Sequence, residues 1–344
     1  MNPARQFLAL TSDRRARAFE QAATQRALDA AIIEKDFWVC WVLGMMFSEP
    51  ALAPHLVFKG GTSLSKVFGV IDRFSEDVDL SVSPAFVGAD AHGFDTLTSR
   101  TRRDAAMIEM QRLCSVKAQD TIAPILDAAI RSALGAPAHS GNWLSYVLDE
   151  QSHSPILYFD YPAGEIPRFE YVRRDVKLEL GSLTDQQPVG LHAVRPWLAE
   201  EFPALFADWH CEVIALDLAR SFWEKATILH AEFHRPENLP TPVRYARHYA
   251  DLARLLAHQN AETFMADKTL CTRVAEWKGR VFARSWARYD LARHGSFRLV
   301  PPAHRQVTLT DDYAVMRPMF LREPPSFADV LRQLAAAEET INSL

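Results

Sequence analysis

The chain has 344 residues, of which 48% are hydrophobic and 24% charged, and its formal net charge is −5. These values are typical of a globular protein with one large or two medium domains, and they exclude a uniformly basic nucleic-acid coat protein. The four cysteines are far apart and form no Cys-x-x-Cys pair, which excludes a zinc ribbon and gives no sign of a disulfide framework. We expect free, mostly buried thiols in a reducing cytoplasm.

The first part of the chain contains one long predicted helix and then a strand-rich block. Apolar residues at helical spacing predict a helix over 13–48, ended by Pro50 and Pro54. Its apolar centre is too short and too interrupted for a membrane helix, and the N-terminus lacks a signal core, so we expect a cytoplasmic protein without a membrane segment. Residues 56–82 predict a strand, a glycine-rich turn, a short helix over 62–71 and a strand over 77–82.

The rest of the chain is predicted to be helical, then strand-rich, then helical again. Residues 95–136 have helical character, whereas 140–190 alternate with period two and predict several strands. Helices are predicted over 211–234, 243–259, 272–293 and 326–344, with a proline-rich loop over 298–306. The pattern predicts an α+β fold: a mixed sheet flanked by helices in a domain of residues 1–200 (helical lead-in 1–50, catalytic sheet 55–190), and a largely helical domain over 201–344.

One short stretch, "FKGGTSLSKVFGVIDRFSEDVDLSV", combines a glycine turn with an acidic pair. In the predicted strand, Asp77 and Asp79 share one face, and two carboxylates on one face favour a divalent cation, Mg²⁺ or Mn²⁺. Gly60 and Gly61 let the backbone approach a triphosphate, and Thr62 is expected to begin a helix whose N–H groups favour anions. The order strand, Gly-Gly-Thr, helix, Asp-x-Asp is more specific than either motif by itself.

Two further segments contain charge in apolar surroundings. In "DVKLELG", Lys177 and Glu179 share a strand face, and Glu179 is a candidate third metal ligand; an ordinary ion pair is the alternative. In "RSFWEKATILH", Glu224 and Lys225 lie in an apolar helix, where charge is costly without a partner. Lys225 and His230 are therefore candidates for contacts with a triphosphate or substrate, and a helix salt bridge is the alternative.

Two C-terminal segments have polar or basic character. Residues Arg244, Arg247, His248 and Asp251 follow helical spacing and predict one polar stripe. Residues 271–305 are rich in arginine and aromatic side chains, which suits phosphate and base contacts, although a solvated helix explains the pattern as well.

The ordered motifs resemble the AbiEii/AbiGii nucleotidyltransferase toxin family, within the polymerase-β-type nucleotidyltransferase superfamily. The resemblance rests on "IIEKDFWV", "FKGGTSLSK", "RFSEDVDLS", "VKLELG", "FWEKATILH", "RHYADL", "DDYAVM" and "PPSFADVL", which span nearly the whole chain. It implies catalytic Asp77, Asp79, Lys225 and Asp251. Our candidate nucleotide-binding residues are Lys59, Gly60, Gly61, Thr62, Lys177, Glu224 and His248, and our candidate metal ligands are Asp77, Asp79 and Glu179.

The resemblance also implies a biological role. The chain would be the toxin of a type IV toxin–antitoxin or abortive-infection pair, with its antitoxin encoded nearby. Some members of the family add nucleotides to the 3′ end of tRNA, so we expect transfer of NMP from an NTP to an RNA acceptor, tRNA in particular, and a block of translation. Nucleotidylation of a protein hydroxyl and a catalytically silent NTP sensor are the alternatives. A kinase is disfavoured, since neither a Walker lysine nor an H-R-D motif is present.

Overall fold

The computed structural model describes residues 4–89, 97, 99–137, 141–150, 152–164, 166 and 173–344. By internal contact the chain divides into two compact units. The first, called the sheet unit, comprises Met1–Val67 and Ser75–Leu216; the second, called the helical unit, comprises Phe68–Phe74 and Asp217–Leu344. The short segment Phe68–Phe74 therefore belongs with helices that follow it by more than 140 residues.

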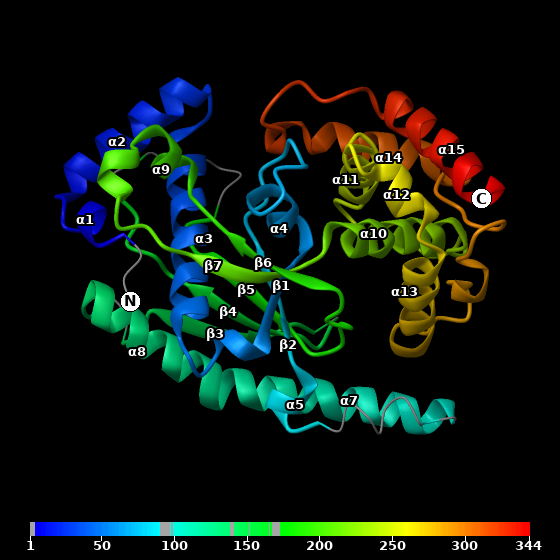
Figure 1. Ribbon diagram of the computed structural model, residues 1–344, viewed down its shortest axis with the longest axis horizontal. Helices are drawn as coiled ribbons and strands as arrows, with labels where there is room; N and C mark the ends of the chain where they lie inside the picture. The colour runs from blue at the N-terminus through cyan, green and yellow to red at the C-terminus, as the bar shows by residue number, and fades with distance from the viewer. Residues whose placement is uncertain are drawn as a thin grey trace. The chain divides into compact units, whose positions relative to one another are not determined.

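In the described part of the sheet unit, seven strands form one sheet. Figure 1 labels these strands and the helices around them. The strands of the sheet unit are β1 Leu56–Lys59, β2 Val78–Val82, β3 Leu144–Leu148, β4 Pro155–Phe159, β5 Val176–Gly181, β6 Val189–Ala193 and β7 Glu212–Leu216. Its helices are α1 Arg5–Leu8, α2 Ser12–Arg26, α3 Ala30–Ser48, α4 Gly60–Lys66, α5 Pro84–Val87, α7 Arg100–Lys117, α8 Ala123–Leu134 and α9 Trp197–Glu201, with short turns η1 Ala53–His55, η2 Ala118–Ile122 (a π-helix) and η3 Pro203–Phe206.

The sheet is mixed, as predicted, with the strand order β3-β4-β5-β2-β1-β7-β6. Strands β2 and β5 run parallel, as do β1 and β7, while the other neighbours are antiparallel. In β5 the side chains of Val176, Leu178 and Leu180 are fully buried, whereas Lys177 and Glu179 are partly exposed. This alternation places one apolar face of the sheet against α3, which is buried along nearly its whole length.

The helical unit is built around α10, which lies against α11 and α13. Its elements are α10 Leu218–Phe233, α11 Ala246–Leu256, α12 Ala261–Ala266, α13 Lys268–Val281, α14 Ala303–Val315 and α15 Phe327–Ser343, with the short turns η4 Tyr289–Leu291 and η5 Arg317–Met319. Asp217 caps α10 by accepting a hydrogen bond from the Ala219 amide at 2.8 Å. In the part of the chain that the structure describes, no helix combines the length and apolarity needed to cross a membrane. All four cysteines are free and buried, as expected.

Several predicted boundaries were wrong in the first half of the chain. The helix predicted over 13–48 is two helices, because Ala27 adopts a left-handed conformation (φ 54°) and Asp29 caps a new helix. The helix predicted from Thr62 to residue 71 begins at Gly60 and ends at Lys66. Residues 167–172, part of a predicted strand, and residues 95, 96 and 98, part of a predicted helix, lie outside the described residues.

Other predicted boundaries were wrong in the second half. The helix predicted over 211–234 starts as strand β7, since Glu212–Leu216, which is apolar after its first residue, fills a sheet position beside β1. The helix predicted over 272–293 ends at Val281, and α14 begins inside the loop predicted over 298–306. A short apolar run is compatible with strand or helix, and only its neighbours in the fold decide between them.

Candidate active site

The polar face of the central strands brings several of the predicted residues together. Asp79 on β2 lies directly opposite Lys59 on β1 and level with Glu179 on β5. Residues paired in this way carry their side chains on the same face of a sheet. Asp77 directly precedes β2, two residues before Asp79, and Lys177 precedes Glu179 by the same spacing. The face thus combines carboxylates from two strands with two lysines.

Gly60 is the residue that leaves room for the Asp79 carboxylate. Its φ is +81°, a conformation that residues with a side chain rarely adopt. A Cβ atom at this position would lie 2.0 Å from Asp79 Oδ2 and 2.8 Å from Asp79 Cγ. The glycine is therefore required both by backbone conformation and by the close approach of this carboxylate.

Thr62 is buried and its hydroxyl is occupied by hydrogen bonds within the sheet unit. Oγ1 lies 3.0 Å from Ser75 Oγ and donates to the Asp77 carbonyl oxygen. Because Thr62 is the third residue of α4 and fully buried, its side chain ties that helix to the segment that enters β2. The Thr62 hydroxyl therefore helps to fix the backbone at Asp77.

Lys177 and Glu179 form an ion pair with a 2.9 Å distance from Nζ to Oε2. Burial by itself lowers the pKa of Lys177, but the hydrogen bond and charge of Glu179, with the charges of Asp77 and Asp79, raise that pKa above its usual value. The ammonium group therefore lies within electrostatic reach of three carboxylates. This acidic face attracts cations, and its oxygen donors are of the kind that Mg²⁺ and Mn²⁺ prefer.

Among the described residues, no group of three or more His, Cys, Asp or Glu side chains is gathered closely enough to hold a metal ion. The acidic pair and Glu179 are thus not a preformed three-ligand cluster, and the Glu179 carboxylate faces a lysine. The donor chemistry fits a divalent cation, with Asp77 and Asp79 as the residues to hold it.

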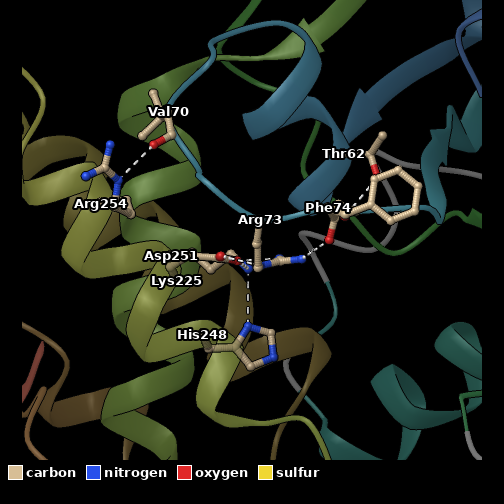
Figure 2. A network of polar contacts seen from close by, with 9 residues as sticks. Thr62, Val70, Arg73, Phe74, Lys225, His248, Asp251 and Arg254 are labelled. Atoms are coloured by element: carbon tan, nitrogen blue, oxygen red, sulfur yellow. Dashed lines mark hydrogen bonds and ion pairs between the residues drawn. The ribbon is translucent and has the colours of Figure 1, made fainter. Parts of the chain in front are cut away.

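The helical unit contains a second cluster, formed by Arg73, Asp251, Lys225 and His248 (Figure 2). Arg73 Nε and Nη2 donate to the two Asp251 carboxylate oxygens at 2.7 and 2.8 Å. Lys225 Nζ lies 2.7 Å from Asp251 Oδ2 and 3.2 Å from His248 Nδ1. Lys225 comes from α10, His248 and Asp251 from α11, and Arg73 from the segment Phe68–Phe74, so the fold joins three distant parts of the sequence.

The charged groups in this cluster shift the pKa values of one another. Burial alone raises the pKa of the Asp251 carboxyl, but Arg73 and Lys225 together hold it well below its usual range. Burial lowers the pKa of Lys225, an effect that Arg73 strengthens and Asp251 opposes. Burial, Lys225 and Arg247 lower the pKa of His248 well below its usual value, so the imidazole is neutral at pH 7.

Other predicted site residues are located elsewhere in the helical unit. Glu224 is bound to Lys278 Nζ at 2.9 Å and Arg220 Nη2 at 2.7 Å, away from the Asp251 cluster. Burial raises the pKa of Glu224, but Lys278 and Arg220 outweigh it and bring that pKa to about 2. Consecutive helical residues point about 100° apart, which explains why Glu224 and Lys225 have different partners.

His230 and Arg244 were also misplaced by the sequence patterns. His230 is fully buried, with Nε2 3.0 Å from the Arg288 carbonyl and Nδ1 accepting from the Arg298 amide, so it is a structural residue. Arg244 lies before α11 with φ 59°, outside the predicted stripe.

The basic segment over 271–305 is largely occupied by internal ion pairs. Lys278 and Arg305 are buried against Glu224 and Glu232. Arg288 pairs with an aspartate two residues away. Lys278 and Arg305 are therefore not available for contacts with nucleic acid.

Sequence reasoning missed two buried cations, Arg73 and Lys35. Arg73 holds Asp251, and Lys35 forms an ion pair with Glu76, the residue before Asp77. A usable signal existed for Lys35, because "EKD" places three consecutive charges inside an apolar helix. Arg73 gave none, since "DRFSED" has the composition of an ordinary loop.

The protein thus has an α+β fold, with an acidic face on the mixed sheet of one unit and a buried Lys–Asp cluster in the helical unit. The family model "Nucleotidyl transferase AbiEii toxin, Type IV TA system" matches residues 41–333. The chain belongs to this family of nucleotidyltransferase toxins, as its motifs indicated. Membership implies an NTP substrate and an antitoxin partner.

Comparison with individual proteins gives weaker relationships. MenT4, the nucleotidyltransferase toxin Rv2826c from Mycobacterium tuberculosis H37Rv, is similar at 16% identity and a TM-score of 0.40, with 98% of this chain and 99% of that chain covered. JHP933 from Helicobacter pylori is similar at 12% identity and a TM-score of 0.39, with 88% of each chain covered. No curated protein sequence matches at a significant level.

Proposed function

We propose that this toxin is a metal-dependent nucleotidyltransferase that transfers NMP from an NTP to an RNA acceptor, the 3′ end of tRNA, and thereby blocks translation. The observation that carries this proposal is the Asp79 carboxylate, which lies against Gly60 and in register with Glu179. Because Gly60 has no side chain, the Asp79 carboxylate can lie against the backbone of the glycine turn. This arrangement, with a second carboxylate nearby, is suited to holding a cation next to a phosphate chain.

The sheet unit supplies the residues for the nucleotide. Asp77 and Asp79 would hold the divalent cation, which when bound offsets the charge of the triphosphate and makes the acceptor hydroxyl easier to deprotonate. Gly60 keeps the Asp79 carboxylate close to the backbone, and Thr62 fixes the segment before β2 through the Asp77 carbonyl. Lys59 lies opposite Asp79, and Lys177 pairs with Glu179 on the same face. We propose that these two cations bind phosphate oxygens.

The helical unit contains a charged cluster of its own. Arg73, Lys225 and Arg247 are cations whose fields reach the same cluster, where Asp251 is the acidic partner. Asp251 fixes the Lys225 ammonium at 2.7 Å, and the neutral His248 imidazole adds no further charge. An excess of cations around a buried carboxylate suits a ligand with phosphate groups. We propose Lys225 as the catalytic lysine that the family motif indicates.

The reaction follows from these roles. The oxygen of an acceptor hydroxyl attacks the α-phosphorus, a new P–O bond forms, and the bond between the α-phosphorus and its bridging oxygen breaks. The hydroxyl proton is lost to solvent and pyrophosphate leaves. Because phosphoryl and nucleotidyl transfer need little covalent participation by the protein, positioning and charge supply most of the rate.

The test is an incubation of the protein with labelled NTPs, Mg²⁺ or Mn²⁺, and total RNA. We expect label in a tRNA-sized band, and we expect Asp79→Asn to reduce it by at least about 1000-fold, since the carboxylate is a proposed cation ligand. Asp72→Asn is the matched control, because Asp72 is a carboxylate seven residues earlier that is 37% exposed and pairs with Arg254. Equal labelling by the wild type and Asp79→Asn contradicts the proposed site.

The location of the label distinguishes the alternatives. Label in protein rather than RNA would identify a hydroxyl side chain as the acceptor. Binding of NTP without release of pyrophosphate would identify a sensor. Either outcome would contradict transfer to an RNA acceptor, and neither would affect the family membership of the chain.

A further inference from the structure

Helix α3 carries three consecutive charged residues, Glu34, Lys35 and Asp36, in the middle of the buried core of the sheet unit. Their exposed fractions are 2%, 1% and 2%. Burying a charge is strongly unfavourable unless a partner of opposite charge or a hydrogen bond compensates it. Because successive helical residues point about 100° apart, each of the three reaches a different segment of the chain.

Lys35 reaches the segments that precede two of the central strands. Its Nζ donates to the carbonyl oxygens of Arg173, at 2.9 Å, and Asp175, and it forms an ion pair with Glu76 Oε2 at 3.2 Å. Asp175 directly precedes β5, and Glu76 precedes β2 by two residues. One ammonium group therefore binds the chain just ahead of both strands that carry the acidic face.

Asp36 reaches the helix that begins at Gly60. Its carboxylate binds Lys66 Nζ at 2.7 Å and accepts from the Trp197 amide at 2.7 Å. Lys66 is the last residue of α4, and its side chain is only 4% exposed. Glu34, on a third side of the helix, accepts a hydrogen bond from the Gly164 amide at 2.8 Å.

The alignment of β2 with β5 depends on contacts such as those of Lys35. The two strands are parallel and separated by almost a hundred residues, so no hairpin turn sets their alignment. A shift of one residue would move Asp79 and Glu179 to opposite faces. The Lys35 contacts bind the start of each strand to the same rigid helix, and the charge of Asp77 also acts on Lys35.

We propose that Lys35 is a positioning residue for the acidic strand face, which holds the starts of β2 and β5 together so that Asp77 and Asp79 are presented to a cation with Glu179 on the same face. The effect of Lys35 on catalysis rests on the proposed nucleotidyl transfer. The effect of Lys35 on strand position and cation binding does not, so the positioning role and the proposed function can be tested separately.

The experiment compares the full-length wild type with Lys35→Met, Lys35→Arg and Glu76→Gln. Hydrogen exchange is followed by mass spectrometry in peptides covering 75–80 and 173–180, and Mn²⁺ binding is measured by calorimetry. For Lys35→Met we expect exchange in both peptides to be at least about tenfold faster, with exchange in the helical unit unchanged. We expect Mn²⁺ affinity to fall about 10–100-fold, the range for residues that orient metal ligands.

Arg305→Met is the matched control. Arg305 is also a buried cation, 4% exposed, that binds backbone carbonyls, those of Pro236 and Leu239, and lies 3.8 Å from a buried glutamate. Its loss should accelerate exchange in the helical unit and leave Mn²⁺ affinity within about twofold of the wild type. Lys35→Arg should recover part of the protection, and Glu76→Gln, which keeps the carbonyl contacts of Lys35, should have an intermediate effect.

The outcomes separate the two proposals. If Lys35→Met leaves both peptides protected, or accelerates exchange equally throughout the chain, Lys35 does not position these strands. Should Lys35→Met fail to fold, Lys35→Arg and Glu76→Gln decide by the same measurements. If the wild type transfers no nucleotide yet the two peptides loosen together and Mn²⁺ binding weakens, the proposed function fails and the positioning role stands.

Discussion

The carboxylate of Asp79 occupies the space that a side chain at Gly60 would fill. An ideal Cβ on Gly60 would lie 2.0 Å from Asp79 Oδ2, far inside van der Waals contact. The relationship connects the first residue of α4 with the second residue of β2, so the glycine turn and the acidic strand form one structural feature.

Replacing Gly60 with alanine should therefore disturb the acidic face. Gly60→Ala must displace the Asp79 carboxylate, and displacement of a reacting group by about 1 Å commonly costs about 100-fold in rate. We expect nucleotide transfer to fall at least that far, measured with labelled NTP, while circular dichroism shows a folded protein. Gly69→Ala is the control, since Gly69 also has positive φ (60°) but nothing lies within 4 Å of its Cβ position. Equal activity losses in the two variants would show that backbone strain, and not displacement of Asp79, causes the loss of transfer.

Glu179 tests whether the acidic face has a third ligand. If its carboxylate leaves Lys177 to contact the cation, Glu179→Gln should raise the Mg²⁺ concentration for half-maximal transfer by about 10–100-fold. A metal titration of the transfer rate measures this shift. Glu212→Gln is the control, because Glu212 is a half-exposed carboxylate on β7. An unchanged metal requirement would leave Glu179 as the ion-pair partner of Lys177 alone.

Arg73 should be the most important cation for the stability of the helical unit. Its side chain is buried and makes two hydrogen bonds to Asp251. Arg73→Met removes both, and the buried Asp251 carboxylate then keeps its ion pair with Lys225. We expect a loss of about 3 kcal/mol in the free energy of unfolding, measured with urea. Arg254→Met removes a pair with Asp72 that is 44% and 37% exposed, and should cost less than about 1 kcal/mol. A similar small loss in both variants would contradict this role for Arg73.

His230 should make the stability depend on pH. Burial lowers its pKa from 6.5 to about 4, and the hydrogen bonds favour a neutral ring that donates from Nε2 to Arg288 and accepts at Nδ1 from Arg298. The unfolded chain binds more protons between these two pKa values, so the free energy of unfolding should fall as pH falls from about 6.5 to 4, by at most about 3 kcal/mol from this residue.

The comparison with His230→Gln isolates this effect. Thermal unfolding of the variant should vary less between pH 6.5 and 4 than that of the wild type, although the variant is less stable at pH 7. His304→Gln, on the exposed side of α14, should follow the wild-type curve. Parallel curves for His230→Gln and the wild type would show that His230 does not titrate in this range.

Local patterns predicted those features that depend on neighbouring residues in the sequence. The alternation in Val176–Gly181 correctly placed Lys177 and Glu179 on the polar face, because side chains of a strand alternate regardless of what the strand pairs with. The strand β7 was read as a helix, since an apolar run of four residues has no periodicity long enough to distinguish the two. The salt bridge of Glu224 with Arg220 lies within one helix and agrees with the alternative that the sequence offered. The pairing of Glu224 with Lys278 could not be predicted, because Lys278 comes from a different helix more than fifty residues away.

The sequence by itself determined the family, the mixed α+β architecture and the acidic pair Asp77 and Asp79, because motif order and strand alternation are properties of the local chain. Only the tertiary structure decided which charges are partners. Arg73 meets Asp251 and Lys35 meets Glu76 across 178 and 41 residues of sequence, respectively. Buried charges must find partners wherever the fold places them, so their pairing follows from the packing of distant segments and not from sequence spacing.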